Sequence, residues 1–345
     1  MKDPAVSSSF LERFFKIKEK NTSVRVEILA GITTFIALAY IMFVNPNILA
    51  DAGIPKEAAV ASTIWIAALS SFAMGVFANY PVALAPGMGL NAFFAYYVCG
   101  VLGLHWTVAL GAVFFSGIFF LILTVSHIRQ AIINAVPPNL RIAIGAGIGL
   151  FIAFIGLKGT GLIIADPATF ITLGHVTKPE TALSLFSLVF TGVLMARNVQ
   201  GAILIGIILT TILSMVLGYS PVPHTLSDII STSLPHMGAT FAQLDIVGAW
   251  NYGIFSIIFT FTVVELFDNM GTLIGLTSKA GLVKETGEIE NLDKALTTDA
   301  FGTIVSSIFG TSTVTSYIES AAGVAAGGKT GLTAVTVSIL FLIAL

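Results

Sequence analysis

The sequence predicts an all-α protein that crosses a membrane many times. Of its 345 residues, 56% are hydrophobic and only 10% are charged, and the mean hydropathy is +0.95. A soluble domain usually carries about 25% charged residues. Apolar runs of the length that crosses a bilayer as a helix, roughly 20 residues, recur along the chain. Two shorter segments among them look like broken helices, which is a feature of many transporters.

The apolar runs predict full spans, with two shorter segments between them. The full spans are expected at 26–49, 58–78, 104–126, 138–157, 181–196, 200–218, 250–276, 296–310 and 331–345. The shorter segments, 82–98 and 311–328, are rich in Gly, Ser and Thr, and each directly follows a full span. Pro86 with two nearby glycines breaks the first, and 311–316 of the second favour extended backbone. Each segment should therefore hold a few extended residues followed by a half-helix.

The basic residues predict the orientation. Residues 1–25 should form a cytoplasmic tail whose short amphipathic helix, with Phe10, Phe14, Phe15 and Ile17, lies on the membrane surface. Threading the chain from there, with each short segment counted as one crossing, leaves thirteen Lys and Arg inside. Only Lys56, Lys158 and Lys178 fall outside. This asymmetry follows the positive-inside rule. The loop 219–249 is expected outside and the loop 277–296 inside.

The crossing order predicts two inverted seven-helix repeats. The first seven crossings cover 26–218, and an eighth begins near 250 after the extracellular loop. A broken segment comes two crossings after both the first and the eighth. Because seven is odd, a second copy would enter the membrane upside down, as in many secondary transporters. Residues 250–345 would supply about four of its seven helices, so the sequence is expected to be a fragment.

Nearly all of the acids lie in loops or at the ends of predicted spans, and the exceptions are Glu265, Asp268 and Glu319. A carboxylate at a helix centre costs about 2.5 to 3.5 kcal/mol on insertion scales. No Lys or Arg lies in the core of any span, so a buried ion pair is a poor explanation. Non-helical backbone at membrane depth is tolerated only against protein or a wet cavity. We therefore expect Glu265 and Glu319 to face one wet chamber beside the unwound segments, together with Asn91 of the first segment.

Simpler explanations remain open for each of these residues. Asn91 can form a hydrogen bond between helices, and the Gly-rich segments can allow helices to pack closely. Asp268 can hold the broken segments by accepting backbone hydrogen bonds. The single cysteine, Cys99, excludes a disulfide framework, and the histidines lie in loops or at span ends, so no metal or cofactor is expected. No catalytic set of an intramembrane hydrolase appears, so the chain is not expected to be an enzyme.

Five stretches carry a resemblance to a known family. They are GITTFIALAYIMFVNPNIL, ANYPVALAPGMGLNAFFAYY, ELFDNMGTLIG, KALTTDAFGT and TSTVTSYIESAAGVAAGGKTGLTA. From about residue 10 to 345 the sequence resembles the bacterial adenine and guanine/hypoxanthine permeases, which are related to the uracil and xanthine permeases. The resemblance implies two inverted seven-helix units with core and gate domains, and proton-coupled purine uptake.

The resemblance also implies roles for individual residues. Glu265 and Glu319 would bind the base, Asp268 would support function, and Asn91 and Ile318 would contribute to the site. Position 265 is where adenine-preferring and oxopurine-preferring members are expected to differ. Its glutamate favours hypoxanthine and guanine. One of the three acids is expected to carry the coupled proton.

The resemblance and the composition together predict the binding partners and the cellular location. They are a purine nucleobase (hypoxanthine, guanine or adenine), protons and the lipid bilayer, and no nucleic acid. A homodimer is left open. The protein should lie in the cytoplasmic membrane with its N-terminus inside. Two other classes are kept as alternatives, an anion transporter of similar fold and a cation-selective channel.

Overall fold

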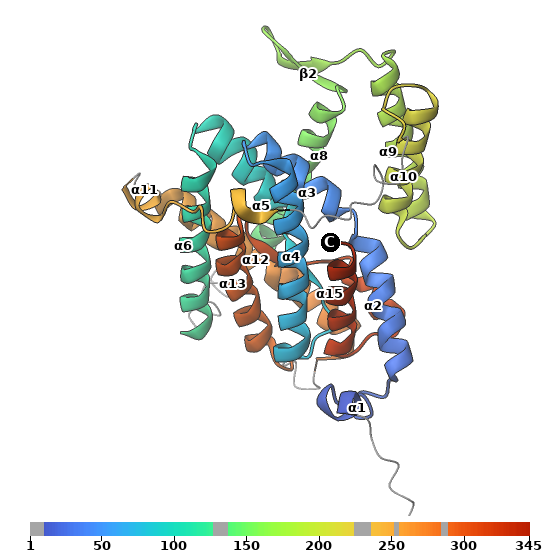
Figure 1. Ribbon diagram of the computed structural model, residues 1–345, viewed down its shortest axis with the longest axis vertical. Helices are drawn as coiled ribbons and strands as arrows, with labels where there is room; N and C mark the ends of the chain where they lie inside the picture. The colour runs from blue at the N-terminus through green and yellow to red at the C-terminus, as the bar shows by residue number, and fades with distance from the viewer. Residues whose placement is uncertain (1–9, 127–136, 224–235, 252–254, 284–288) are drawn as a thin grey trace, which may run out of the picture.

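The computed structural model describes residues 10–126, 137–223, 236–251, 255–283 and 289–345. The chain is mainly helical, and most of its helices run side by side (Figure 1). Parts of the predicted tail and of both long loops lie outside the described residues. Within the described part, five helices are long and apolar enough to span a membrane: Val24–Asp51, Lys56–Ala78, Trp106–Val125, Pro179–Ala196 and Phe255–Lys279. The prediction of a polytopic α-helical protein is confirmed.

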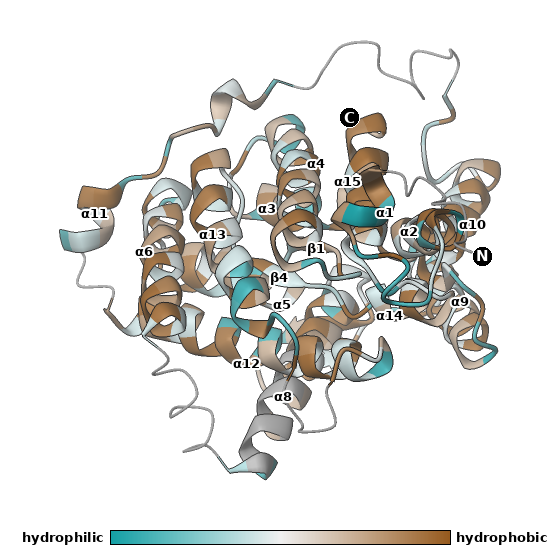
Figure 2. Cartoon of the chain, turned by 90° about the horizontal axis from the view of Figure 1, so that it is seen from below, coloured by the Kyte–Doolittle hydropathy of each residue, from teal (hydrophilic) through white to brown (hydrophobic). Residues whose placement is uncertain are grey.

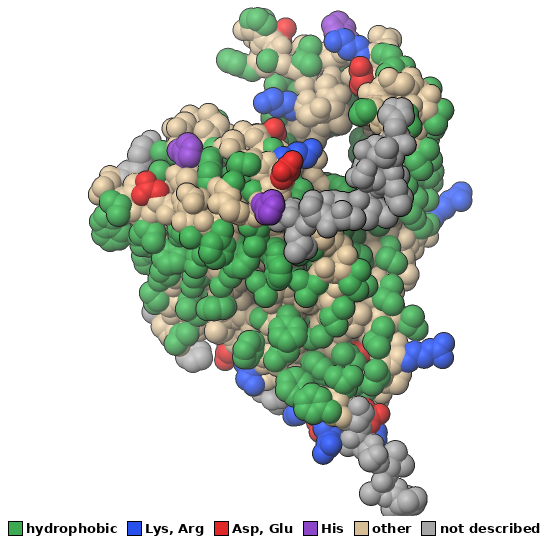
Figure 3. Space-filling model, in the orientation of Figure 1, with side chains coloured by type: hydrophobic (Ala, Val, Ile, Leu, Met, Phe, Trp, Pro, Cys, Tyr) green, Lys and Arg blue, Asp and Glu red, His purple; other side chains and the backbone are tan. Residues whose placement is uncertain are grey.

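The helices follow the predicted spans closely. They are α2 (Val24–Leu38), α3 (Ile41–Asp51), α4 (Lys56–Ala73) with a π-helical end η1 (Met74–Ala78), α6 (Trp106–Val125), α8 (Pro138–Gly159), α9 (Pro179–Ala196), α10 (Ala202–Val216), α11 (Ile246–Asn251), α12 (Phe255–Lys279), α13 (Leu292–Phe309) and α15 (Gly331–Ile343). The first predicted span is divided between α2 and α3. An apolar band crosses the middle of the molecule, while charged side chains gather mostly towards its two ends (Figure 3).

Both broken segments have the predicted form. The first contains β1 (Leu84–Pro86), α5 (Met88–Ala92) and the π-helical turn η2 (Phe93–Val101). The second contains β4 (Val314–Ser316) and α14 (Ser320–Ala325). The two strands pair with each other in antiparallel register, with Ala85 opposite Thr315. They lie side by side in the interior, surrounded by helices (Figure 2).

The outer edges of this two-stranded ladder are bonded by side chains of neighbouring helices. Ser71 Oγ of α4 accepts from Leu84 N at 3.0 Å, and Ser320 Oγ of α14 accepts from Ala83 N at 3.0 Å. Thr303 Oγ1 of α13 accepts from Val314 N at 3.1 Å. An unpaired backbone group at this depth would cost free energy comparable to a lost hydrogen bond. These side chains therefore make it possible for extended backbone to lie inside the helical array.

Helix packing around the strands depends on small residues and on one buried carboxylate. Glycines of η1 and α15, Gly75 and Gly331, meet backbone to backbone, so α15 packs directly on the end of α4. Glu27 of α2 is fully buried and accepts hydrogen bonds from Lys329 N, Thr330 N and Thr333 Oγ1 at 2.6–3.2 Å. A carboxylate suits this place because the first N–H groups of a helix have no partner within it.

The N-terminal tail differs from its prediction. Helix α1 (Phe10–Phe14) is present, but its apolar residues do not share one membrane-facing surface. Phe10 and Phe14 are exposed, whereas Phe15 and Ile17 are buried against Leu332 of α15. The chain turns after Phe14, so the following apolar residues pack on the protein instead of on lipid.

A hairpin after α8 was not predicted. Strands β2 (Ile163–Asp166) and β3 (Phe170–Leu173) pair in the loop before α9. At its turn, Asp166 Oδ1 accepts from Ala168 N and Thr169 N at 2.8 Å each. These hydrogen bonds lower the pKa of Asp166, because they favour the charged form of the carboxyl group. A short turn of this kind gives only a weak sequence signal.

We expect Gly331→Ala to lower the free energy of unfolding by about 1–3 kcal/mol, the usual cost of overpacking. An added Cβ would overlap the carbonyl oxygen of Gly75. Thermal unfolding of the purified protein in detergent measures the effect. The control is Gly275→Ala in α12, where a Cβ meets nothing within 4 Å. Equal unfolding midpoints for the two variants would contradict the packing described for α15.

Candidate functional site

A cavity of about 200 Å³ lies where the two broken segments meet α12 and α8. Its wall is formed by residues of α5, α8, α12 and the second broken segment, together with Tyr40 just before α3. The lining residues are Tyr40, Met88, Gly89, Ile152, Asp268, Thr272, Thr315, Ser316, Tyr317, Ile318 and Glu319. Three residues singled out from the sequence, Asp268, Ile318 and Glu319, therefore line one cavity, from two helical regions far apart in the chain.

Glu319 is held by a tyrosine from the first span. It follows directly on the extended residues of the second broken segment and is half-buried. Tyr40 Oη donates to Glu319 Oε1 at 2.6 Å, and both residues line the cavity. The neighbouring Ile318 is 58% exposed, so its side chain is available on the cavity side of the segment. The carboxylate keeps Oε2 as a further acceptor.

Asp268 faces the same cavity from α12. It is half-buried, and its Oδ2 lies 3.1 Å from Thr315 Oγ1 of β4, a hydroxyl whose single proton is shared between Asp268 and Asn269 Oδ1 at 2.9 Å. The alternative from the sequence is that Asp268 holds the broken segments by accepting backbone hydrogen bonds, and the contact found is to a side-chain hydroxyl of the second segment instead. The same carboxylate also lines the cavity, so contact with the strand and contact with a ligand are compatible.

Glu265 does not line this cavity. It is fully buried and turned towards α6 and α13, where Thr303 Oγ1 donates to Oε1 and Ser116 Oγ donates to Oε2 at 3.5 Å. The expectation that Glu265 and Glu319 face one chamber is therefore not met. Residues three apart on a helix differ by about 60° around its axis. In α12 the cavity wall passes between Glu265 and Asp268, so Asp268 is the acid that shares the cavity with Glu319.

Asn91 also lies behind the cavity wall. It is fully buried, donates to Asn45 Oδ1 and accepts from Ser312 Oγ. Asn45 in turn donates to Thr63 Oγ1 at 2.8 Å and to Thr311 Oγ1 at 3.2 Å. Asn91 thus connects the first broken segment to the start of the second. This is the hydrogen-bonding role that the sequence left open.

Two further buried residues matter at the site: Asn269, which the sequence places beside the face of Glu265 and Asp268, and Asp299, which sequence reasoning missed. Asn269 Oδ1 accepts from Ser316 N at 2.8 Å and from Thr315 Oγ1 at 2.9 Å, while its Nδ2 donates to Asp299 Oδ2. Asp299 of α13 is fully buried, and its Oδ1 has no hydrogen-bond partner in the described part of the chain. It is a further interior acid, overlooked because it lies near the start of a predicted span. The available signal was that Asp299 lies in KALTTDAFGT, one of the stretches that carry the family resemblance.

The chemistry of the cavity is that of a hydrogen-bond acceptor site. Two carboxylates and several hydroxyls face it, and its described lining residues include no Lys or Arg. Carboxylates accept hydrogen bonds, in pairs where the ligand offers adjacent N–H groups. Tyr40 and Tyr317 add aromatic rings to the wall. A small, neutral molecule with several N–H donors fits this arrangement better than an anion.

Sequence comparison finds relatives over nearly the whole chain. A sequence profile described as "Permease family" matches residues 25–345. A putative permease of Methanocaldococcus jannaschii is 50% identical over 97% of this chain and 76% of its own length. The adenine permease AdeP of Escherichia coli is 44% identical, covering 96% of this chain and 74% of its own. The guanine/hypoxanthine permease PbuO of Bacillus subtilis is 41% identical, with 95% and 76% covered.

A solved structure shares the fold. The transmembrane domain of the cyanobacterial bicarbonate transporter BicA superposes with a TM-score of 0.66 and 18% identity, covering 93% of this chain and 82% of that domain. At this level of identity the likeness concerns the helical arrangement only. It agrees with the all-α membrane fold predicted from the sequence.

We expect Asn269→Leu to loosen the second broken segment. The substitution removes the acceptor for the buried Ser316 N–H, and an unsatisfied buried donor costs about 1–3 kcal/mol. Hydrogen–deuterium exchange of peptides covering 311–319 should become faster. The control is Asn47→Ala, since Asn47 is exposed and donates to Phe43 O within its own helix. Unchanged exchange in Asn269→Leu would show that the strand does not depend on this side chain.

Proposed function

Because this chain belongs to the permease family, a family of transporters rather than enzymes, we propose that it takes up purine nucleobases together with protons. The observation that carries the proposal is the pair Asp268 and Glu319, two acids from separate elements that line one cavity beside the paired strands. The names of the AdeP and PbuO relatives supply the substrate class. The bases they name are planar, mostly neutral and rich in N–H donors.

Recognition would rest on the carboxylate of Glu319. Tyr40 donates to Oε1, which would orient the group and leave Oε2 as the acceptor for a ligand. A charge-assisted hydrogen bond is roughly twice as strong as a neutral one. Asp268 would accept from a second N–H of the same base, and the ring would lie against Tyr317 or the exposed Ile318. Glu265 and Asn91 would support the site from behind.

Hypoxanthine and guanine would be preferred over adenine. An oxopurine carries a ring N–H beside its carbonyl, which gives a carboxylate one N–H to accept from, and in guanine the adjoining amino group allows two parallel bonds. Adenine has no ring N–H on this edge and offers only its amino group there, beside a ring nitrogen that is an acceptor. Two acids in the cavity, with no cation among its described lining residues, therefore favour the oxopurines.

Proton coupling would use the acids of this site. Burial disfavours the charged form of a carboxyl group, and a second acid nearby adds to that effect. Asp268 and Glu319 face the cavity and can exchange a proton with it, while Glu265 is sealed behind Thr303 and Ser116. Either of the cavity acids would take up a proton with the base on the outer side and release it inside.

The proposal includes the position of the chain in the membrane. Residues 1–25 would be a cytoplasmic tail, 26–218 the first seven-helix repeat, 219–249 an extracellular loop, and 250–345 part of a second, inverted repeat. The protein would lie in the cytoplasmic membrane with its N-terminus inside. The antiparallel pairing of one strand from each broken segment supports this division, because inverted copies would bring equivalent segments together head to tail.

The anion transporter remains a second candidate because BicA shares the fold. An anion site needs positive charge or free N–H donors, whereas this cavity presents two carboxylates. A cation channel would need these acids to line an open pore. Neither alternative accounts for the relatives named as purine permeases.

We expect Glu319→Gln to reduce uptake of labelled hypoxanthine into proteoliposomes at least tenfold. Replacing the charged acceptor removes a hydrogen bond worth about 1.5–3 kcal/mol, and 1.4 kcal/mol corresponds to a factor of ten. In the unchanged protein, an inward proton gradient should raise uptake and a protonophore should abolish the increase. The control is Glu180→Gln, an exposed acid at the start of α9. Normal, proton-coupled transport by Glu319→Gln would refute the role of Glu319.

Competition measures the preferred base. Unlabelled hypoxanthine and guanine should displace labelled hypoxanthine at lower concentrations than adenine, because each presents a lactam N–H to the carboxylates. Xanthine and uracil complete the series, and sulfate and bicarbonate serve as anion controls. Displacement by adenine at the lowest concentration would reverse the assigned preference, and inhibition by bicarbonate alone would favour the anion transporter.

A further inference from the structure

A second, larger cavity lies at the end of the boundary between η2 and α8. Its volume is about 360 Å³, and its wall is formed by the last residue of α3, one side of η2 and the last two turns of α8. Small-molecule sites commonly enclose roughly 300–1,000 Å³. We call it the outer cavity, because α3, η2 and α8 all end here, on the side where the basic residues predict the cell exterior.

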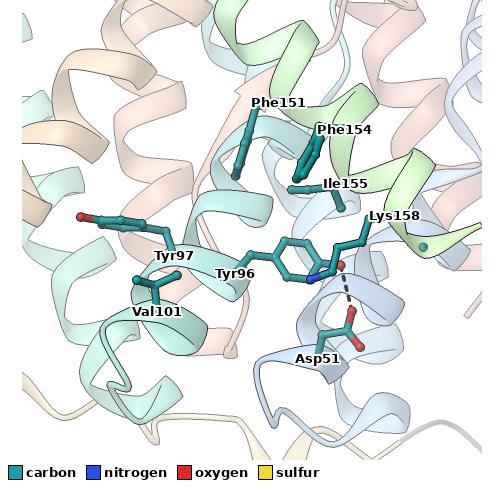
Figure 4. Close-up of a pocket in the computed structure, with 9 residues that line it drawn as sticks. Asp51, Tyr96, Tyr97, Val101, Phe151, Phe154, Ile155 and Lys158 are labelled. Carbon is teal, nitrogen blue, oxygen red and sulfur yellow. Dashed lines mark hydrogen bonds between the residues drawn. The ribbon is translucent and has the colours of Figure 1, made fainter. Parts of the chain in front are cut away.

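Polar groups collect at one end of the outer cavity. Tyr96 Oη donates to Asp51 Oδ2 at 2.8 Å, and Lys158 lines the same end (Figure 4). Asp51 and Lys158 are both exposed, and no ion pair joins Lys158 to a carboxylate of the described residues. The cavity therefore offers a carboxylate acceptor and an ammonium donor that do not neutralise each other.

Aromatic rings form most of the remaining wall. Tyr96 and Tyr97 of η2 line the cavity together with Phe151 and Phe154 of α8, and in Figure 4 the Tyr96 ring points towards Lys158 and Asp51 while the Tyr97 ring points away from them. Tyr97 is itself stacked on Phe93, with ring centroids 5.1 Å apart and planes within 17°. Aromatic walls favour flat ligands, because ring faces pair well in offset or edge-to-face geometry. Polar groups at one end and rings elsewhere suit a planar heterocycle with N–H groups on its edge.

A further cavity shares lining residues both with the outer cavity and with the cavity of about 200 Å³ at Asp268 and Glu319, which we call the central cavity. This third cavity, of about 340 Å³, shares Tyr97 and Phe151 with the outer cavity and Gly89 with the central cavity. Its other walls are mainly apolar and come from α5, η2, α8 and α12. The three cavities thus form a series from Asp51 and Lys158 to Asp268 and Glu319, and Tyr97 and Phe151 stand between the first two.

We propose that the outer cavity is a second binding site for a purine nucleobase, occupied before the base passes Tyr97 and Phe151 towards the central cavity. The proposal rests on the proposed purine uptake and adds a site to it. In the outer cavity the base stacks on the aromatic wall while Asp51 accepts from its N–H groups and Lys158 donates to a ring nitrogen or carbonyl. The wet, exposed polar end makes this site weaker than the central one.

Tyrosines near a membrane boundary also serve as lipid-interface anchors. That role needs neither a carboxylate bonded to the hydroxyl nor a lysine on the same wall. The two explanations differ in the number of bases that each protein molecule binds.

The test is equilibrium binding of labelled hypoxanthine to the protein in lipid nanodiscs. The unchanged protein should bind two bases per chain, with affinities at least tenfold apart. The double variant Asp51→Asn with Lys158→Gln should lose the weaker class and keep the stronger one, which also shows that it is folded. Glu319→Gln should lose the stronger class and keep the weaker one. In proteoliposomes, the double variant should raise KM at least fivefold with little change in the maximal rate.

Neighbouring exposed charges provide the matched control. Glu57→Gln with Lys56→Gln removes an acid and a lysine at the start of α4, outside the cavity walls, and should leave two bound bases. One bound base in the unchanged protein, unaffected by the Asp51 and Lys158 substitutions, would overturn the outer site alone. No bound purine in any form would overturn the proposed function and the outer site together.

Discussion

The structure depends on a single constraint, which is that backbone polar groups buried at membrane depth must find partners inside the protein. β1 and β4 meet this constraint by pairing with each other. Their remaining N–H groups bond to hydroxyls and an amide from α4, α13, α14 and α12. The extended backbone is therefore stable only as part of the whole arrangement, since each strand needs both the other strand and the helices around it.

The same constraint explains why some helices are unusually polar. The inward side of α13 carries Asp299, Thr303, Ser306 and Ser307, all buried. Helix α13 is not among the described helices that are apolar enough by composition to span a membrane, although it packs along α6 within the helical array. A helix shielded by its neighbours can carry the hydroxyls that the strands require. In the more exposed α9, by contrast, hydroxyls bond within the helix or to its neighbour α10, as Ser184 Oγ does to Glu180 O and Thr210 Oγ1 does to Ser187 Oγ.

The polar residues of the site fall into two layers. Asp268 and Glu319 face the cavity, whereas Glu265 and Asp299 lie behind it, bonded to Thr303 and Asn269. Thr303 and Asn269 also bond to β4, because Thr303 accepts from Val314 N and Asn269 accepts from Ser316 N. The rear acids are thus connected to the strand whose end residues line the cavity, and they reach a ligand only through that strand. The front acids can contact a ligand directly.

The sequence by itself determined the approximate positions of most described helices, the two broken segments and most of the acids that matter. Apolar run length, Pro86 and the clustered Gly, Ser and Thr are local signals, and local geometry follows from them. The tertiary structure alone decided that β1 pairs with β4, that Asn91 bonds to Asn45, and that Phe15 packs on α15 instead of on lipid. It also decided that Asp268, and not Glu265, shares a cavity with Glu319. Residues three apart lie on nearly the same helix face, so only the packing of α6 and α13 against α12 determines which of them faces the cavity.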